Sequence, residues 1–273
     1  MLYNRERGVL QQMKKTLTDK IPFELPFEVK RFIGNSQIYD SSSSPEARVY
    51  FIDKDEGYFL KLSKKGTLKR EAEMTGYFHS KGLGAEVLFY LSGENDLLLT
   101  ERIRGEDCTH ADYLSDPARL CDTIAERLRA LHELDFSGCP VKDRISEYLA
   151  LAEKNYLSGD YDTSFFPDSF GYASAEQAYG KLCKGKSELK SNTLIHGDYC
   201  LPNIILDNWR FSGFIDLGAA GVGDRHIDLF WGAWTLSFNL KTDKYRDRFY
   251  DAYGRDKINT DLIDVVASAE VFG

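Results

Sequence analysis

The spacing of hydrophobic residues changes near residue 104, from short apolar runs to helical repeats. Before this point, runs of Val, Ile, Leu, Phe and Tyr predict β-strands, because such side chains pack well on a pleated surface. These strands are expected at residues 49–52, 58–62, 85–90 and 97–102, with one helix at about residues 68–80. After residue 104, apolar residues recur every three or four positions, as at Leu120, Ile124, Leu128 and Leu131. The pattern predicts a β-rich first part and a mainly helical second part.

The second part also contains short segments with strand character. Ser115-Asp116-Pro117 is a favourable helix start, with a capping side chain followed by a proline. Further helices are expected at about residues 143–156, 174–182, 231–238, 245–253 and 261–269, and strands at 193–196, 204–206 and 211–215. Strands with one helix, followed mostly by helices, predict an α+β fold in two lobes. We place the N-terminal lobe at residues 1–102 and the C-terminal lobe at residues 103–273.

Composition is typical of an ordinary globular protein. The chain has 273 residues, enough for a sizeable core, with 42% hydrophobic and 29% charged residues. No run of about 18 apolar residues is present, so we expect no membrane-spanning helix and no membrane partner. The first residues lack the apolar segment of a signal peptide, and a cytoplasmic protein is therefore expected. We expect it to be a monomer or a weak dimer.

Net charge and cysteine usage argue against two other classes. The formal net charge is -8 at pH 7, whereas non-specific nucleic-acid binding needs a basic face, so we expect no nucleic-acid partner. The five cysteines include no CxxC pair and no histidine at zinc-ligand spacing. We expect free thiols, mostly buried.

Residues 180–187, Gly-Lys-Leu-Cys-Lys-Gly-Lys-Ser, match the P-loop pattern GxxxxGK[ST] letter for letter. A phosphate-binding P-loop needs a buried strand before it and a helix after it, so that backbone amides converge on the phosphates. Here a polar helical segment precedes Gly180, and only a few residues separate Ser187 from the next strand. We therefore interpret the segment as the end of a helix, with Gly185 in its last turn.

The segment His196-Gly197-Asp198 carries the strongest chemical signal. It follows a short apolar run, Asn203 comes five residues after Asp198, and Asp216 follows the next predicted strands. A carboxylate that orients a hydroxyl, with an amide and a second carboxylate that hold magnesium, is the minimum set for phosphoryl transfer in kinases.

A strand lysine followed by a helix glutamate adds to this signal. Lys61 lies on the opposite face from Leu60 and Leu62, because side chains alternate along a strand. Kinases pair such a lysine with a helix glutamate to hold the α- and β-phosphates. Helical phase alone does not decide between Glu71 and Glu73, and we choose Glu71.

These motifs resemble those of the aminoglycoside phosphotransferases, small-molecule relatives of the protein kinases. His-Gly-Asp with Asn at residues 196–203 resembles their catalytic loop, and Phe-Ile-Asp-Leu-Gly at residues 214–218 their metal-binding motif. The match is closer to the aminoglycoside 3′-phosphotransferases, whose nucleotide loop resembles residues 43–50 and whose closing Glu-Leu-Phe is similar to residues 270–272. The resemblance covers nearly the whole chain. It implies a bilobal protein-kinase-like fold with a small β-rich N-terminal lobe and a larger helical C-terminal lobe.

The resemblance implies an enzyme that moves the γ-phosphate of ATP or GTP, with Mg²⁺, to a hydroxyl of an aminoglycoside antibiotic and so confers resistance. We expect the 3′-hydroxyl to be the acceptor. Asp198 would be the catalytic residue that accepts a hydrogen bond from this hydroxyl, Asn203 and Asp216 would bind the metal, and His196 would position the backbone. Residues implied at the nucleotide are Ser43, Ser44, Lys61, Glu71, Thr100, Arg102, Ile103 and Ile215. Residues implied at the aminoglycoside are Asp160, Asp162, Asp198, Asn239, Glu270 and Phe272.

Two alternatives stay open. Ala219 stands where the 3′ branch commonly has arginine, and residues 164–166, Ser-Phe-Phe, stand where further carboxylates are expected. These differences favour, as one alternative, a kinase of the same fold for another small hydroxylated amine or sugar. The other alternative is a non-catalytic nucleotide-binding homologue, against which the presence of Asp198 and both metal ligands argues.

Overall fold

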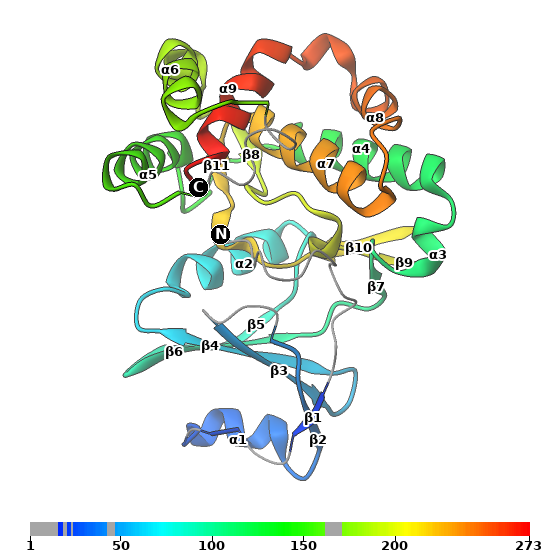
Figure 1. The fold of residues 1–273 in the computed structure, drawn as a ribbon. Helices are drawn as coiled ribbons and strands as arrows, with labels where there is room; N and C mark the ends of the chain where they lie inside the picture. The colour runs from blue at the N-terminus through cyan, green and yellow to red at the C-terminus, as the bar shows by residue number, and fades with distance from the viewer. Residues whose placement is uncertain (1–15, 19–20, 23, 43–46, 162–170) are drawn as a thin grey trace. The chain divides into compact units, whose positions relative to one another are not determined.

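The computed structural model describes residues 16–18, 21–22, 24–42, 47–161 and 171–273. Its contacts separate the chain, drawn in Figure 1, into two compact units. The sheet unit comprises the described residues up to Tyr113 together with residues 202–218. The helical unit comprises residues 114–201 and 219–273, as far as they are described. Both units are discontinuous in sequence, and the lobe boundary placed after residue 102 stays a prediction.

An antiparallel sheet forms the larger part of the sheet unit. Its strands are β1 (Thr16–Thr18), β2 (Gln37–Asp40), β3 (Ala47–Asp53), β4 (Tyr58–Lys64), β5 (Val87–Ser92) and β6 (Asn95–Glu101), in the order β1-β2-β3-β4-β6-β5. The helices of this unit are α1 (Phe27–Ile33) and α2 (Lys69–Ser80). The strands and the helix predicted from apolar runs are present. The predicted elements do not include α1, β1 and β2, because these segments have no clear apolar period.

Burial alternates along β4 as predicted. Leu60 and Leu62 are buried in the core of the sheet unit, and Leu60 lies opposite Leu99 of β6. Lys61, between them, therefore projects from the other face of the sheet. The apolar face of the strand fixes the direction of this lysine.

A smaller sheet joins the two segments of this unit. Its strands are β7 (Glu106–Asp107), β9 (Ile204–Asp207) and β10 (Arg210–Phe214), in the order β10-β9-β7. The turn between β9 and β10 has positive φ at Asn208 (51°) and Trp209 (66°), which is the conformation of a tight two-residue hairpin. At the other end of the hairpin Ile204 pairs with Phe214.

Helices make up most of the helical unit. The short α3 (Ala111–Leu114) lies at the boundary, with all but Leu114 in the sheet unit. The helices of the helical unit are α4 (Pro117–His132), α5 (Arg144–Ser158), α6 (Ala175–Gly185), α7 (Arg225–Leu240), α8 (Arg246–Tyr253) and α9 (Thr260–Glu270). A two-stranded sheet pairs β8 (Thr193–Ile195) with β11 (Gly221–Gly223). Helix α4 begins as predicted, because the Asp116 side chain accepts a hydrogen bond from Arg119 N at 3.2 Å and Pro117 is in the first turn.

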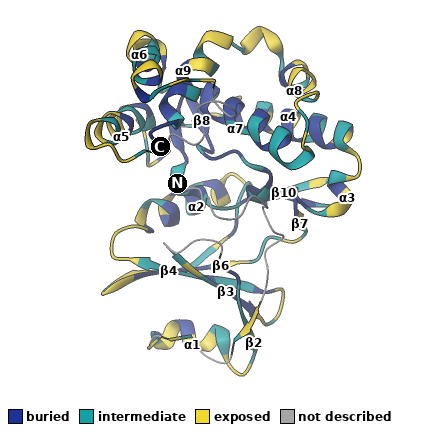
Figure 2. Cartoon of the chain, in the orientation of Figure 1, coloured by how far each residue is buried: buried dark blue, intermediate teal, exposed yellow. Residues whose placement is uncertain are grey.

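The core of the helical unit lies among α5, α6, α7, α9 and β8. All three residues of β8 are buried (Figure 2), so the chain enters the following segment from a rigid base. Residues of this core include Ile145, Ala152, Ala178, Leu182, Ile195, Val265, Val266 and Phe272. Within the described ranges, no helix is long and apolar enough to cross a membrane.

The segment that matches the P-loop pattern is helical. Helix α6 contains Gly180 and ends at Gly185, and a short 3-10 helix at residues 186–188 follows it. Among the described residues around this segment, no strand leads directly into Gly180 and no α-helix begins directly after Ser187, as the sequence predicts.

Replacing Gly185 with alanine is expected to lower the free energy of unfolding by about 1–3 kcal/mol, as overpacking does. The added Cβ would lie 2.2 Å from Cγ2 of Val265 on α9, so the two helices would have to shift. Gly180→Ala is the matched control in the same helix, where no atom lies within 4 Å, and it should stabilise the protein by about 0.5–1 kcal/mol. Urea denaturation compares them, and equal stabilisation by both would contradict this packing.

Candidate active site

Lys61 forms the centre of a charged cluster in the sheet unit. Its Nζ lies 2.7 Å from Oε2 and 2.9 Å from Oε1 of Glu71 on α2, and 3.0 Å from Oδ1 of Asp216. Of the two helix glutamates, Glu71 contacts Lys61, whereas Glu73 lies 3.8 Å from Lys69 at the surface. Strand β4, helix α2 and the segment after β10 thus bring three predicted site residues together.

The electrostatics of this cluster keep the lysine charged. Burial lowers the pKa of Lys61, but the carboxylates of Asp216 and Glu71 outweigh this effect and hold the pKa above its usual range. Burial raises the pKa of Glu71, the Lys61 ammonium acts in the opposite direction, and the negative charge of the nearby Asp216 raises it further. One positive and two negative charges leave a formal net charge of about -1, which suits a further cation.

The hairpin of β9 and β10 places Asn203 beside the segment that carries Asp216. Because Ile204 pairs with Phe214, the next residues on either side also meet, and Ile215 N donates to Asn203 O at 3.0 Å. Asp216 has φ of 58°, in the left-handed region that residues other than glycine rarely adopt. Side-chain oxygens of an amide and a carboxylate are the hard donors that magnesium prefers, so the donor chemistry fits this ion.

A buried carboxylate fixes the loop that carries Asp198. After β8, His196 N and Gly197 N donate to the two carboxylate oxygens of Asp228 on α7, each at 2.7 Å. His196 Nδ1 accepts a hydrogen bond from Asp198 N at 3.3 Å, so the ring of this histidine contacts the backbone of the loop. Gly197 has φ of 80°, and an added Cβ would lie 2.1 Å from Ala219 O, which explains the glycine.

The Asp228 carboxylate has a further partner, His132, that the sequence did not indicate. His132 Nε2 lies 3.1 Å from Oδ2 of Asp228, and His132 Nδ1 lies 2.9 Å from the hydroxyl of Tyr253. Burial lowers the pKa of His132, so we take it as neutral, with Nε2–H donating to Asp228 and Nδ1 accepting from Tyr253. Arg225 Nη1 in turn donates to the Tyr253 hydroxyl at 3.2 Å. This buried network joins α4, α7 and α8 to the loop of Asp198.

Glu270 lies at the end of α9 with two donors on one oxygen. Tyr148 donates its hydroxyl to Oε1 at 2.9 Å, and Trp231 Nε1 donates to the same oxygen at 3.1 Å. Burial raises the pKa of Glu270 to about 7, although these two hydrogen bonds act in the opposite direction. Neither Tyr148 nor Trp231 is among the predicted site residues, because 122 and 39 positions separate them from Glu270.

The other residues predicted at the aminoglycoside differ in exposure. The Phe272 ring is buried (1% exposed), and its carbonyl accepts a hydrogen bond from Asn155 Nδ2 at 2.7 Å. Asp160 is exposed just after α5. Asn239 on α7 donates from Nδ2 to Thr235 O at 2.8 Å. Asp162 lies outside the described residues, as do Ser43 and Ser44 of the predicted nucleotide loop.

The residues predicted at the nucleotide base lie along one stretch of the sheet unit. Thr100 is half-buried in β6, and Arg102 and Ile103 follow directly. Ile103 packs against Gly213 of β10, where an added Cβ would lie 2.7 Å from its Cδ1. Ile215 is half-buried in the segment that leads to Asp216.

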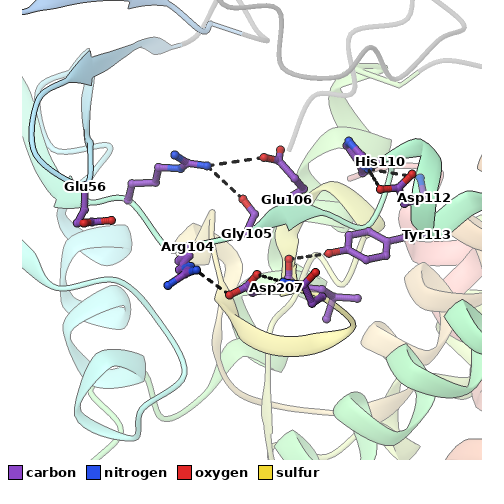
Figure 3. A pocket seen from close by; sticks show the side chains of 11 residues that line it. Glu56, Arg104, Gly105, Glu106, His110, Asp112, Tyr113 and Asp207 are labelled. Atoms are coloured by element: carbon purple, nitrogen blue, oxygen red, sulfur yellow. Dashed lines mark hydrogen bonds and ion pairs between the residues drawn. The ribbon is translucent and has the colours of Figure 1, made fainter.

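Figure 3 shows a pocket beside this stretch, lined mainly by charged side chains. Arg102 Nη2 lies 3.7 Å from Glu106 Oε1, and Arg104 Nε lies 3.2 Å from Asp207 Oδ2. Both arginines already face carboxylates, and we assign this pocket no role of its own.

Comparisons with known proteins agree with these motifs. The model of the phosphotransferase enzyme family matches residues 42–263. A probable aminoglycoside 3′-phosphotransferase of Lactococcus lactis subsp. lactis is 53% identical over 92% of this chain and 95% of its own length. An aminoglycoside 3′-phosphotransferase of Niallia circulans is 30% identical over 87% of this chain and 93% of its own.

Solved structures confirm the α+β, kinase-like fold. A type VIII aminoglycoside 3′-phosphotransferase superposes with a TM-score of 0.69 at 21% identity, covering 86% of this chain and 91% of that one. An aminoglycoside phosphotransferase from Streptomyces rimosus, solved with ADP and streptomycin, has a TM-score of 0.66 at 22% identity, with 83% and 91% covered. The resemblance inferred from the motifs is confirmed, and the chain belongs to the phosphotransferase enzyme family, among relatives named aminoglycoside 3′-phosphotransferases.

Proposed function

We propose that this protein transfers the γ-phosphate of a nucleoside triphosphate to a hydroxyl of an aminoglycoside, with the 3′-hydroxyl as acceptor, and so confers resistance. The observation that carries this proposal is the fixed loop after β8, in which Asp228 holds the amides of His196 and Gly197 just before Asp198. The identity to the L. lactis relative over most of both chains supports the aminoglycoside as substrate.

Asp198 acts as the residue that accepts the hydrogen bond of the attacking hydroxyl. A carboxylate held in place can orient the hydroxyl toward the γ-phosphate and receive its proton as the new P–O bond forms and the bond to the departing nucleoside diphosphate breaks. Asp198 is only 7% exposed, so little water competes for this position.

Lys61 neutralises charge on the α- and β-phosphates of ATP or GTP. The Glu71 carboxylate, in contact with its ammonium through both oxygens, keeps it oriented. We also assign to the nucleotide the predicted residues Thr100, Arg102, Ile103 and Ile215, together with Ser43 and Ser44, which lie outside the described residues. Asn203 and Asp216 would hold Mg²⁺, which would supply positive charge to offset that of the phosphates.

Carboxylates recognise the amines of the aminoglycoside, because charge-assisted hydrogen bonds favour ammonium groups. Glu270 at the end of α9 and Asp160 after α5 serve this role in our proposal, together with Asp162, which is close to Asp160 in sequence. Asn239 and Phe272 complete the predicted set.

Phosphorylation of a panel of aminoglycosides tests the proposal. Compounds with and without a 3′-hydroxyl are incubated with ATP or GTP and magnesium, and the gain of one phosphate is followed by mass spectrometry. We expect only the compounds with a 3′-hydroxyl to be modified. Equal modification of compounds that lack this group would refute the 3′ assignment, and no modification of any compound would refute the aminoglycoside as substrate.

Replacing Lys61 with methionine is expected to lower kcat/KM for the nucleotide by about 10- to 100-fold, the effect of losing a hydrogen bond between charged groups. Methionine has a similar length but no ammonium, so the phosphates lose their partner. Lys64→Met, at the exposed end of the same strand, is the control and should leave kcat/KM within about twofold. Steady-state kinetics with varied nucleotide checks this, and equal behaviour of the two variants would exclude the role of Lys61.

A further inference from the structure

The two oxygens of the Glu270 carboxylate are in different situations. Oε1 accepts both the Tyr148 hydroxyl and the Trp231 indole N–H. Among the described residues, no donor reaches Oε2, although the side chain is only partly exposed. Both oxygens of a carboxylate can accept hydrogen bonds, so Oε2 can accept one from a donor that is not among the described residues.

Helix α5 holds the last residues of the chain at two points. Tyr148 and Asn155 are seven residues apart, which places them two turns apart on one face of the helix. Tyr148 contacts Glu270 at 2.9 Å, and Asn155 Nδ2 contacts Phe272 O at 2.7 Å. The buried Phe272 ring packs edge-on against Tyr156 of the same helix, at 5.5 Å between ring centroids. Helix α5 therefore holds the side chain of Glu270 and the backbone of Phe272, the residues on either side of Val271.

Trp231 is equally restrained on α7. Its ring lies edge-on to Trp234 at 5.4 Å and to Phe230 at 5.3 Å between centroids. These contacts limit rotation of the indole, so its N–H stays directed at Glu270. The carboxylate is thus held from α5 and from α7.

We propose that Tyr148 and Trp231 are positioning residues for substrate recognition, which fix Oε1 of Glu270 so that Oε2 receives one ammonium group of the aminoglycoside. This inference rests on the proposed function. The two donors also stabilise the ionised form of Glu270, whose pKa is raised to about 7 by burial, with a smaller contribution from the negative charge of Asp198. Loss of either donor raises this pKa further, so less of the carboxylate is ionised at neutral pH and the ammonium is bound more weakly.

Tyr148→Phe and Trp231→Phe test the proposal because each removes one donor and keeps an aromatic ring. We expect each to raise the Kd for the aminoglycoside, measured by calorimetry at pH 7, by about 3- to 30-fold. The KM should rise in parallel, with kcat and the KM for nucleotide within about twofold. Affinity for the aminoglycoside should rise with pH as Glu270 ionises, and the midpoint of this rise should lie at higher pH in both variants than in the wild type. A merely structural role would not produce this shift.

Tyr172→Phe is the matched control in the same unit, since it removes a hydroxyl that donates to Asp264 O at 2.8 Å. It should change neither the Kd nor its pH dependence. In a Glu270→Gln background, Tyr148→Phe should have no further effect on affinity, because no carboxylate remains to be ionised.

The proposal is overturned if Tyr148→Phe and Trp231→Phe behave like Tyr172→Phe, or if Tyr148→Phe still weakens binding in the Glu270→Gln background. Failure of the proposed function looks different. An aminoglycoside that binds the wild-type protein through Glu270 but is never phosphorylated would refute the activity and leave the role of Tyr148 and Trp231 supported.

Discussion

Replacing Asp198 with asparagine is expected to lower kcat for aminoglycoside phosphorylation by about 100- to 10,000-fold, the range for loss of a general base. The amide has nearly the same shape as the carboxylate, but it cannot take the proton of the attacking hydroxyl. The backbone N–H of Asp198 donates to Nδ1 of the His196 ring, and this bond does not use the Asp198 side chain, so the loop itself should keep its conformation. The effect should therefore appear in kcat and not in folding.

Nucleotide binding should be largely unchanged in this variant, because the residues that we assign to the phosphates belong to the sheet unit. Steady-state kinetics for the antibiotic and calorimetric titration with nucleotide separate the two properties. Asp256→Asn, at an exposed site in the 3-10 helix Arg255–Lys257, is the control. A kcat near that of the wild type in Asp198→Asn would exclude Asp198 from the chemistry.

Local patterns were sufficient to predict the part of the site built from neighbouring elements. Alternation along β4 fixes the direction of Lys61, and only two glutamates at the start of α2 could meet it. The hairpin that brings Asn203 beside the segment of Asp216 is equally local, since its two strands adjoin in sequence. In such cases the period of the strand or helix determines which side chains meet.

Long-range contacts carry the rest of the site, and no local pattern predicts them. His132 and Asp228 are 96 positions apart, and Tyr148 and Glu270 are 122 apart. Each residue looks like an ordinary member of an amphipathic helix until the packing of the helices brings the pair together. The sequence therefore predicts the groups that act on phosphate better than the groups that hold them in place.

Asp228→Ala is expected to lower the free energy of unfolding by about 3–5 kcal/mol, because it leaves several buried donors without an acceptor. The Asp228 side chain is fully buried and accepts from His196 N, Gly197 N and His132 Nε2. Two of these donors are backbone amides of the catalytic loop, so activity should fall together with stability. Urea denaturation measures the first effect, and kcat at a temperature where the variant is folded measures the second.

Asp122→Ala is the matched control, since it also removes a carboxylate with side-chain partners, but at the surface, where Asp122 on α4 pairs with Arg248 at 2.6 Å. Exposed ion pairs contribute about 0–1 kcal/mol, so this variant should lose much less stability. Asp228→Asn covers the case in which the alanine variant does not fold. The single carbonyl oxygen of the asparagine can accept from only some of the donors that Asp228 satisfies, and its NH₂ group would face the remaining N–H donors. Hydrogen exchange at the Gly197 amide should therefore become faster than in the wild type. Unchanged exchange in Asp228→Asn, or equal losses in Asp228→Ala and Asp122→Ala, would show that this carboxylate does not hold the loop.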